Sequence, residues 1–326
     1  MCIYVKITEE FILEDYMDLS QITTAVSTQV LVMLVLIILG YVLTKRSLLT
    51  NKGVEEMTTI LVNIVTPCVL IRAYHIPFDK KQVYNLLIGY GVCFAVHFVY
   101  FIIARFYFIS EKDKSRALIN QASGAYSNCG FMGIPLLEAC LGSMGTFYGS
   151  TYLGVFNILI WSHLLCKFKP GEEKFKFSKL INPGIVGVLI GLVFYFTQFK
   201  LPVFAYDSIS FMANLNTPIA MIVIGNMLAK SKLREVLKMP DIYSVSVFKL
   251  ILAPLLLAFI LRILDLDTTM SIAIVICSAC PSAAIVPIFA RKYKLDYEYS
   301  AKLTVSTTVF SLITIPVVCY LTTLIL

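Results

Sequence analysis

The chain has 326 residues and a formal net charge of +7, and 58% of its residues are hydrophobic while only 14% are charged. A soluble domain contains about 25% charged residues, and a soluble chain of this size could not bury so much apolar surface in one core, so the composition excludes a soluble globular protein. The basic residues occupy short clusters between apolar stretches and accompany no aromatic-basic platform, so we expect no nucleic-acid partner. This segregation is typical of helices that span a lipid bilayer.

The first 25 residues are acidic, with five Asp and Glu residues against a single Lys. A signal peptide begins with a positively charged region, so we expect residues 1–25 to form a short extracytoplasmic segment. A membrane-spanning helix requires about 20 mostly apolar residues. Ten stretches meet this condition, and we call them predicted helices 1 to 10: 26–44, 54–74, 82–108, 116–140, 143–166, 183–199, 203–229, 241–263, 269–291 and 298–325. The sequence therefore predicts an all-α polytopic membrane protein with ten transmembrane helices.

The connections between these helices carry an asymmetric charge. One side of the predicted bundle receives 20 of the 27 Lys and Arg residues, and the other side receives six. Positively charged loops remain in the cytoplasm. We therefore predict that the basic side is cytoplasmic and that both termini are extracytoplasmic, in a multi-pass protein of the plasma (inner) membrane.

The longest connection between spans covers residues 167–182 and is rich in Lys. This predicted cytoplasmic linker separates two halves of five helices each, residues 26–166 and 183–326. Because five is an odd number, the two halves must insert in opposite orientations. That is the geometry of inverted-topology transporter repeats.

A repeated pattern supports an internal duplication. Predicted helix 2 reads N-x-x-T-P at residues 63–67, and predicted helix 7 reads the same at residues 214–218. The offset between the two patterns is 151 residues, and the same offset aligns Ser127 in helix 4 with Ser278 in helix 9. One offset that serves two separate helix pairs indicates two related five-helix repeats.

Helix-breaking residues interrupt predicted helices 2, 4, 7 and 9 near their middles. They are Pro67 in helix 2, Gly130, Gly133 and Pro135 in helix 4, Pro218 in helix 7, and Pro281 and Pro287 in helix 9. Proline removes a backbone donor, and an unsatisfied backbone group in hydrocarbon costs several kcal/mol. A simple kink would explain any one of these sites, but paired breaks in two inverted halves are typical of a binding site. We therefore expect hinges or helix breaks at Pro67, Pro135, Pro218 and Pro287.

Neutral polar residues surround these breaks: Asn63, Thr66, Ser127, Asn128, Asn214, Asn216, Thr217 and Ser278. Asn and Ser side chains donate hydrogen bonds without carrying a charge, and the N-termini of opened half-helices attract anions. The pattern predicts a site for a small organic anion, in which Asn128 and Ser127 donate to a carboxylate and Ser278 is a further binding residue.

Other residues complete this predicted site. The half-helix ends at Gly130 and Pro281 are expected to add backbone N–H groups, while Asn63 and Asn216 line the opposite side. For Asn63 and Asn214, a structural bridge between helices fits the pattern equally well.

The predicted spans contain almost no charge at mid-depth. No carboxylate lies there, so coupling to H⁺ or Na⁺ is left open. Lys249 is the one charge inside a span. We expect its side chain to reach the inner end of its helix, about two turns away, and the alternative is a role in attracting the anion. No nucleophile–base pair and no metal-ligand spacing occur at one depth, so we expect neither an enzyme nor a metal site nor a cofactor.

The segment Asn128–Leu136 reads NCGFMGIPL, which resembles the N-x-G-F-x-G-x-P-L signature of the auxin efflux carrier family, the PIN-like transporters and their bacterial relatives. Similar positions continue in the same order, and the resemblance covers the chain from about residue 26 to its end. They are Asn182-Pro183, Leu201-Pro202, Thr217-Pro218-Ile219-Ala220, Gly225, Pro281, Ser306-Thr307-Thr308 and Thr314-Ile315-Pro316.

The resemblance implies a fold in which predicted helices 4 and 9 are broken and cross at the substrate site. By this resemblance the residues that flank the site are Asn128, Cys129, Gly130, Cys280 and Pro281. It also implies a scaffold of helices 1, 2, 6 and 7, along which a transport domain of helices 3–5 and 8–10 slides like an elevator. A homodimer formed through the scaffold is implied as well.

The chain departs from the plant members of that family in two ways. The loop at 167–182 is short, which favours a bacterial-type member, and Pro67 is followed by Cys68 and Val69 where some plant relatives have acidic neighbours. We therefore expect a secondary transporter of small organic anions, of which malonate is a better candidate than auxin-like acids. Two alternatives remain: a Na⁺-coupled symporter resembling the bile-acid family, and a membrane sensor or receptor that binds without transport.

Overall fold

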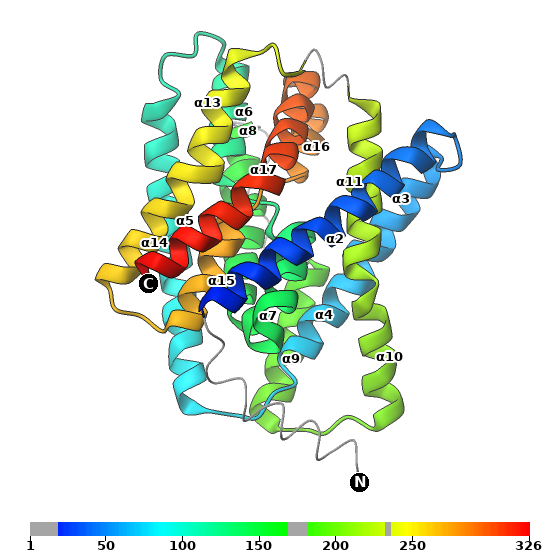
Figure 1. Ribbon diagram of the computed structural model, residues 1–326, viewed down its shortest axis with the longest axis vertical. Helices are drawn as coiled ribbons and strands as arrows, with labels where there is room; N and C mark the ends of the chain where they lie inside the picture. The colour runs from blue at the N-terminus through cyan, green and yellow to red at the C-terminus, as the bar shows by residue number, and fades with distance from the viewer. Residues whose placement is uncertain (1–18, 169–181, 232–235) are drawn as a thin grey trace.

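The computed structural model describes residues 19–168, 182–231 and 236–326, and the regular elements within them are helices (Figure 1). Seven of these described helices are long and apolar enough to cross a membrane. They are Gln21–Lys45, Asn51–Ala73, Lys80–Tyr107, Cys129–Phe168, Val203–Lys230, Pro240–Ile263 and Tyr297–Ile325. Two shorter apolar helices are Pro183–Thr197 and Thr268–Ala279. The protein is therefore an all-helical, multi-pass membrane protein.

The first half of the chain forms ten described elements. They are α2 (Leu19–Lys45), α3 (Asn51–Ile60), η2 (Leu61–Val65), α4 (Thr66–Ala73), α5 (Lys80–Tyr107), α6 (Lys114–Ala125), η3 (Cys129–Gly133), α7 (Ile134–Leu159), η4 (Ile160–Leu164) and α8 (Leu165–Phe168). The elements η2, η3 and η4 are π-helical turns. Because η2 joins α3 to α4 without a gap, these three form one continuous helix.

The described part of the second half also consists of α-helices and a π-helical turn. Its elements are α9 (Pro183–Thr197), α10 (Val203–Asn214), α11 (Asn216–Lys230), α13 (Pro240–Val247), η6 (Phe248–Leu252), α14 (Ala253–Ile263), α15 (Thr268–Ala279), α16 (Ile285–Lys292) and α17 (Tyr297–Ile325). The π-helical turn η6 joins α13 to α14 in one helix.

Most of two predicted segments lies outside the described part of the chain. Residues 1–18 of the predicted N-terminal segment and residues 169–181 of the predicted linker lie outside it. Helix α2 begins at Leu19, earlier than the predicted start at residue 26. The reason is that residues 19–25 carry no charge, so they extend the apolar helix.

Helix α7 contains a sharp kink at Gly142, whose backbone has φ 58° and ψ −149°. This conformation is open to glycine because it has no side chain beyond the α-carbon. The kink falls between predicted helices 116–140 and 143–166. A single glycine thus takes the place of the short loop that the sequence pattern predicts there.

Helix α2 runs obliquely across the molecule and packs against both α11 and α17 (Figure 1). Glycines allow the closest approaches between helices. A Cβ atom added at Gly225 in α11 would overlap the backbone of α2 and lie 2.7 Å from the amide nitrogen of Tyr41. Likewise, a Cβ atom added at Gly187 in α9 would lie 2.7 Å from the Cα atom of Pro67 in α4. Small residues at such contacts allow backbones to pack directly in a membrane.

Substituting Gly225 by alanine is expected to destabilise the α2–α11 pair by about 3 kcal/mol, because the added methyl group meets rigid backbone rather than a movable side chain. Thermal unfolding of the purified protein in detergent measures this change. The matched control is Gly91→Ala, since a Cβ atom at Gly91 in α5 has no neighbour within 4 Å. Equal unfolding temperatures for the two variants would contradict the close packing of α2 and α11.

Candidate functional site

Two helices of the described structure are interrupted by non-helical segments that meet. Residues 126–128 separate α6 from η3, and residues 280–284 separate α15 from α16. The two segments run antiparallel and are joined by a β-bridge between Ser127 and Ser282. These breaks lie at the positions that the sequence predicts, next to Gly130 and at Pro281. We call this meeting point the crossover.

Backbone hydrogen bonds between the two segments satisfy groups that the helix breaks leave open. The Asn128 N–H donates to the Pro281 carbonyl at 2.7 Å, and the Ala283 N–H donates to the Tyr126 carbonyl at 3.0 Å. Unpaired backbone groups are costly inside a membrane, and irregular backbone is tolerated there where it is buried in protein or lines a cavity. These two hydrogen bonds therefore hold the crossover together, and its polar backbone is buried in the protein.

Lys249 is the charged residue buried beneath the crossover. Its side chain has 0% exposure. Its Nζ atom donates to the Ser127 hydroxyl at 2.5 Å and to the Ser278 carbonyl at 3.0 Å. The prediction that Lys249 reaches the inner end of its helix is thus wrong. The physical reason is that the carbonyl end of α15 carries a partial negative charge, and two acceptors replace the water that the ammonium group loses.

The two serines that the 151-residue offset pairs are in direct contact. The Ser127 hydroxyl donates to the Ser278 carbonyl at 3.2 Å and lies 3.0 Å from the Tyr152 hydroxyl. The Ser278 hydroxyl bonds to the Tyr100 hydroxyl at 2.7 Å, and Tyr100 in turn donates to the carbonyl of Ala253. Both serines are fully buried, so they hold the crossover together rather than facing open space.

Asn128 differs from these serines because its side chain reaches a small cavity of about 10 Å³. The cavity is lined by Asn128, Ile224, Met227, Leu228, Ala284, Thr304, Val305 and Thr308. The Asn128 side chain is 7% exposed and makes no hydrogen bond within the described residues, and the buried hydroxyl of Thr304 has no partner there either. This volume is about the smallest that can hold one water molecule. The cavity is therefore too small to hold an organic anion as it stands, and Asn128 and Thr304 are polar residues in its wall.

Three cysteine side chains near the crossover pack around Gly133. A Cβ atom added at Gly133 would lie 3.4 Å from each of the Cys129 Cβ, Cys277 Sγ and Cys280 Sγ atoms. All three cysteines are buried free thiols. Within residues 19–168, 182–231 and 236–326, no group of three or more His, Cys, Asp or Glu side chains is arranged to hold a metal. Cys129 and Cys280 therefore flank the crossover without lining the cavity, and Gly130 is half-buried beside them.

The predicted scaffold-side residues are not brought to the cavity. Asn63 is exposed, and its amide donates to the Thr59 carbonyl of its own helix at 2.9 Å. Asn216 is buried at the start of α11 with its Oδ1 atom unpaired, but it is not among the residues that line the cavity. Asn214 accepts a hydrogen bond from Arg72 at 2.7 Å, so its role as a bridge between helices is the one observed.

The four predicted hinge prolines all lie near the start of an α-helical element. Pro67, Pro135, Pro218 and Pro287 belong to the starts of α4, α7, α11 and α16. Pro218 and Pro287 lie in first turns, where the missing N–H of proline has no helical partner. Pro67 and Pro135 instead closely follow the π-helical turns η2 and η3, which continue into α4 and α7. At Pro67 the preceding π-helical turn η2 keeps the helix continuous, so the predicted break in helix 2 is wrong. At Pro218 the interruption is confined to Leu215.

An ion pair and a hydrogen bond made by Arg72 join three helices. Arg72 in α4 binds Glu138 in α7 and also the Asn214 side chain of α10. This contact, the Thr304 hydroxyl and the tyrosines beside the serines are absent from the sequence-based prediction. No spacing marks them, because Tyr and Thr are ordinary residues of membrane helices and their partners lie on distant helices.

Comparisons with known proteins find similar sequences over most of the chain. A family model described as membrane transport protein matches residues 25–179 and 172–319. The chain is 21% identical over 299 residues to an uncharacterized transporter of Methanocaldococcus jannaschii, covering 88% of this chain and 95% of that protein. An uncharacterized transporter of Methanothermobacter thermautotrophicus is 24% identical over 299 residues, with the same coverage. The chain therefore belongs to the membrane transport protein family, as its resemblance to the auxin efflux carriers predicted.

Proposed function

We propose that the protein is a secondary transporter of small organic anions, carboxylates such as malonate, that works by alternating access. The observation that carries this proposal is the pair of unpaired donors at the cavity. Asn128 and Thr304 both line this cavity, and neither the Asn128 amide nor the Thr304 hydroxyl has a hydrogen-bond partner among the described residues. Buried polar groups normally have hydrogen-bond partners, so a ligand rich in acceptor oxygens fits this position.

The charges around the crossover favour an anion. The Lys249 ammonium lies behind Ser127, the residue that precedes Asn128. The helix that begins with η3 starts at Cys129, and a helix N-terminus carries a partial positive charge of about +0.5. No acidic side chain is among the residues that line the cavity. We infer that a carboxylate would be bound by neutral donors within a positive field.

We further propose that the chain crosses the membrane ten times, as two inverted five-helix repeats with both termini extracytoplasmic in the plasma membrane. The packing supports a division into two groups of helices. The proposed scaffold elements pack on one another, α2 on α11 and α4 on α9 and α10, and α7, α14, α15 and α17 form a second connected group. The two groups meet where α2 packs on α17 and α7. An elevator movement of the second group against a dimeric scaffold would carry the crossover across the membrane.

The position of Lys249 bears on the coupling ion. In Na⁺-coupled transporters, backbone carbonyls of unwound helices coordinate the ion. The carbonyl of Ser278 at the end of α15 is already bonded to the Lys249 ammonium at 3.0 Å. We infer that this ammonium occupies the place of a coupling cation, which weighs against the Na⁺-coupled alternative at this position.

Small dicarboxylates are expected to stabilise the purified protein against heat, because a ligand that binds only the folded state adds about 2.7 kcal/mol at 100 times its Kd. The experiment compares malonate with malonamide, which has a similar shape and no charge, by thermal unfolding in detergent. Stabilisation by malonate alone supports an anion site. If no carboxylate in a panel raises the unfolding temperature, the organic-anion proposal is wrong.

A further inference from the structure

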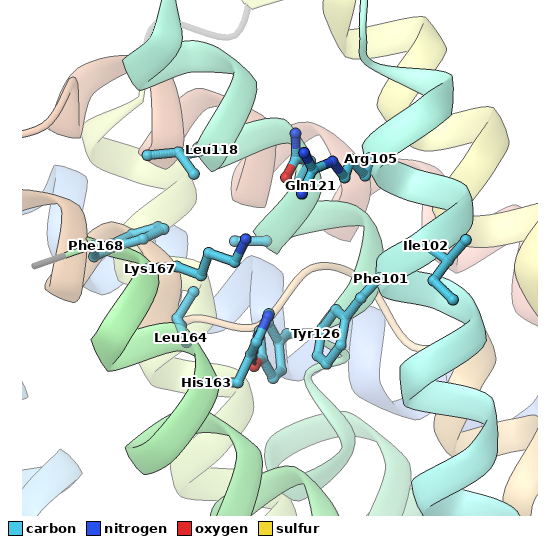
Figure 2. Close-up of a pocket in the computed structure, with 11 residues that line it drawn as sticks. Phe101, Ile102, Arg105, Leu118, Gln121, Tyr126, His163, Leu164, Lys167 and Phe168 are labelled. Atoms are coloured by element: carbon cyan, nitrogen blue, oxygen red, sulfur yellow. Dashed lines mark hydrogen bonds between the residues drawn. The ribbon is translucent and has the colours of Figure 1, made fainter. Parts of the chain in front are cut away.

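A second cavity, of about 160 Å³, lies between α5, α6 and the end of the helix formed by η4 and α8 (Figure 2). It is lined by Phe101, Ile102, Arg105, Leu118, Gln121, Ala122, Tyr126, His163, Leu164, Lys167 and Phe168. None of these residues lines the cavity at Asn128. The second cavity is therefore distinct from the cavity at Asn128, although Tyr126 of the crossover forms part of its wall.

Two cations at this cavity have no acidic partner among residues 19–168, 182–231 and 236–326. Arg105 lies in the last turn of α5 and Lys167 in α8, and both side chains are exposed. Neither forms an ion pair or a side-chain hydrogen bond within the described part of the chain. Figure 2 shows Lys167 extending into the cavity, with Arg105 and Gln121 together at its far edge. These three side chains offer donors to a single anion.

The remaining walls are apolar. Phe101 stacks on the His163 ring with centroids 4.0 Å apart, and His163 is held by the Tyr126 hydroxyl at 3.1 Å. Next to Arg105 on α5, the side chains of Ile102 and Phe106 are 43% and 64% exposed. In a membrane helix these exposed apolar side chains face lipid. The cavity thus combines a cationic edge with apolar walls that continue onto the lipid-facing surface.

We propose that this cavity binds the headgroup phosphate of an anionic membrane phospholipid, with an acyl chain lying along Ile102 and Phe106 of α5. Arg105 and Lys167 would bind the phosphate oxygens, Arg105 through its fork of N–H groups. Basic pockets between transmembrane helices on the cytoplasmic side bind anionic headgroups in this way. A free anion would use the cations but not the apolar walls, so the walls favour a lipid.

Native mass spectrometry of the full-length protein tests this proposal, with phosphatidylglycerol and phosphatidylcholine of equal acyl chains. The wild-type protein is expected to retain phosphatidylglycerol in preference to phosphatidylcholine. The double variant Arg105→Gln/Lys167→Gln is expected to retain it about 30-fold less, which corresponds to about 2 kcal/mol for two basic residues. The matched control is Arg291→Gln/Lys292→Gln, which removes the same charges from the exposed end of α16 and should behave as wild type.

Two outcomes would overturn the proposal. Equal retention of phosphatidylglycerol by the Arg105→Gln/Lys167→Gln variant and by the wild type would place the lipid elsewhere. Displacement of the bound phosphatidylglycerol by millimolar inorganic phosphate would show that the cavity recognises a free anion. Neither outcome depends on transport, so the result is independent of the function proposed for the crossover.

Discussion

Replacing Lys249 by methionine is expected to lower carboxylate uptake about 30-fold while the protein stays folded. The substitution keeps most of the length of the side chain but removes the ammonium that bonds Ser127 and Ser278. At an effective dielectric constant of about 20, a charge about 8 Å from an anion contributes about 2 kcal/mol, or about 30-fold in affinity. Replacing a buried ionic group by an apolar one of similar volume is often neutral for stability.

The experiment measures initial uptake of radiolabelled malonate into proteoliposomes together with the unfolding temperature of each variant. Lys230→Met is the matched control, because Lys230 lies exposed at the end of α11 and should not affect the field at the crossover. Uptake by Lys249→Met at the rate of Lys230→Met would mean that the buried ammonium has no part in binding. A large fall in unfolding temperature would instead assign Lys249 a mainly structural role.

Truncating Asn128 to alanine is expected to lower malonate uptake about 10- to 100-fold, because a hydrogen bond to a charged group contributes about 1.5–3 kcal/mol. The backbone N–H of Asn128, which bonds the Pro281 carbonyl, is retained in this variant, so the crossover should keep its shape. Asn128→Asp is nearly isosteric and adds a negative charge at the cavity. It is expected to reduce uptake further still, by repelling the anion.

The variant Asn63→Ala, compared with Asn128→Ala, tests which of these two predicted residues belongs to the binding site. Asn63 is exposed and bonded within its own helix, so this variant is expected to transport as wild type. If Asn63→Ala lost uptake and Asn128→Ala did not, the site would lie on the α3–α4 side of the protein rather than at the crossover.

Much of the fold follows from patterns that can be seen in the chain itself. Apolar runs mark the spanning helices, because every backbone group inside a membrane must be satisfied within a helix. Helix breakers mark the crossover, since Gly130 lies two residues after one non-helical segment and Pro281 lies within the other. The 151-residue offset places Ser127 and Ser278 at equivalent positions, and the two residues are bonded to each other.

Other features could not be predicted because they depend on which face of a helix meets a distant neighbour. The depth of Lys249 along its helix is readable from sequence, but its burial depends on acceptors supplied by two other helices. Thr304 reaches the cavity from α17, a helix with many similar Thr and Ser residues, so nothing distinguishes it in the sequence. At Pro67 the same N-x-x-T-P pattern was compatible with an open break or with the π-helical turn that is observed.

Uptake of radiolabelled malonate into sealed proteoliposomes containing the wild-type protein, with unlabelled carboxylates as competitors, tests the central proposal most directly. The proposal predicts saturable uptake that other small carboxylates inhibit, that malonamide leaves unchanged and that continues when Na⁺ is replaced by K⁺. Uptake that requires Na⁺ would select the symporter alternative, and carboxylate binding without any uptake would select a sensor. The absence of both uptake and binding for every carboxylate, in vesicles shown to be intact, would contradict the organic-anion assignment.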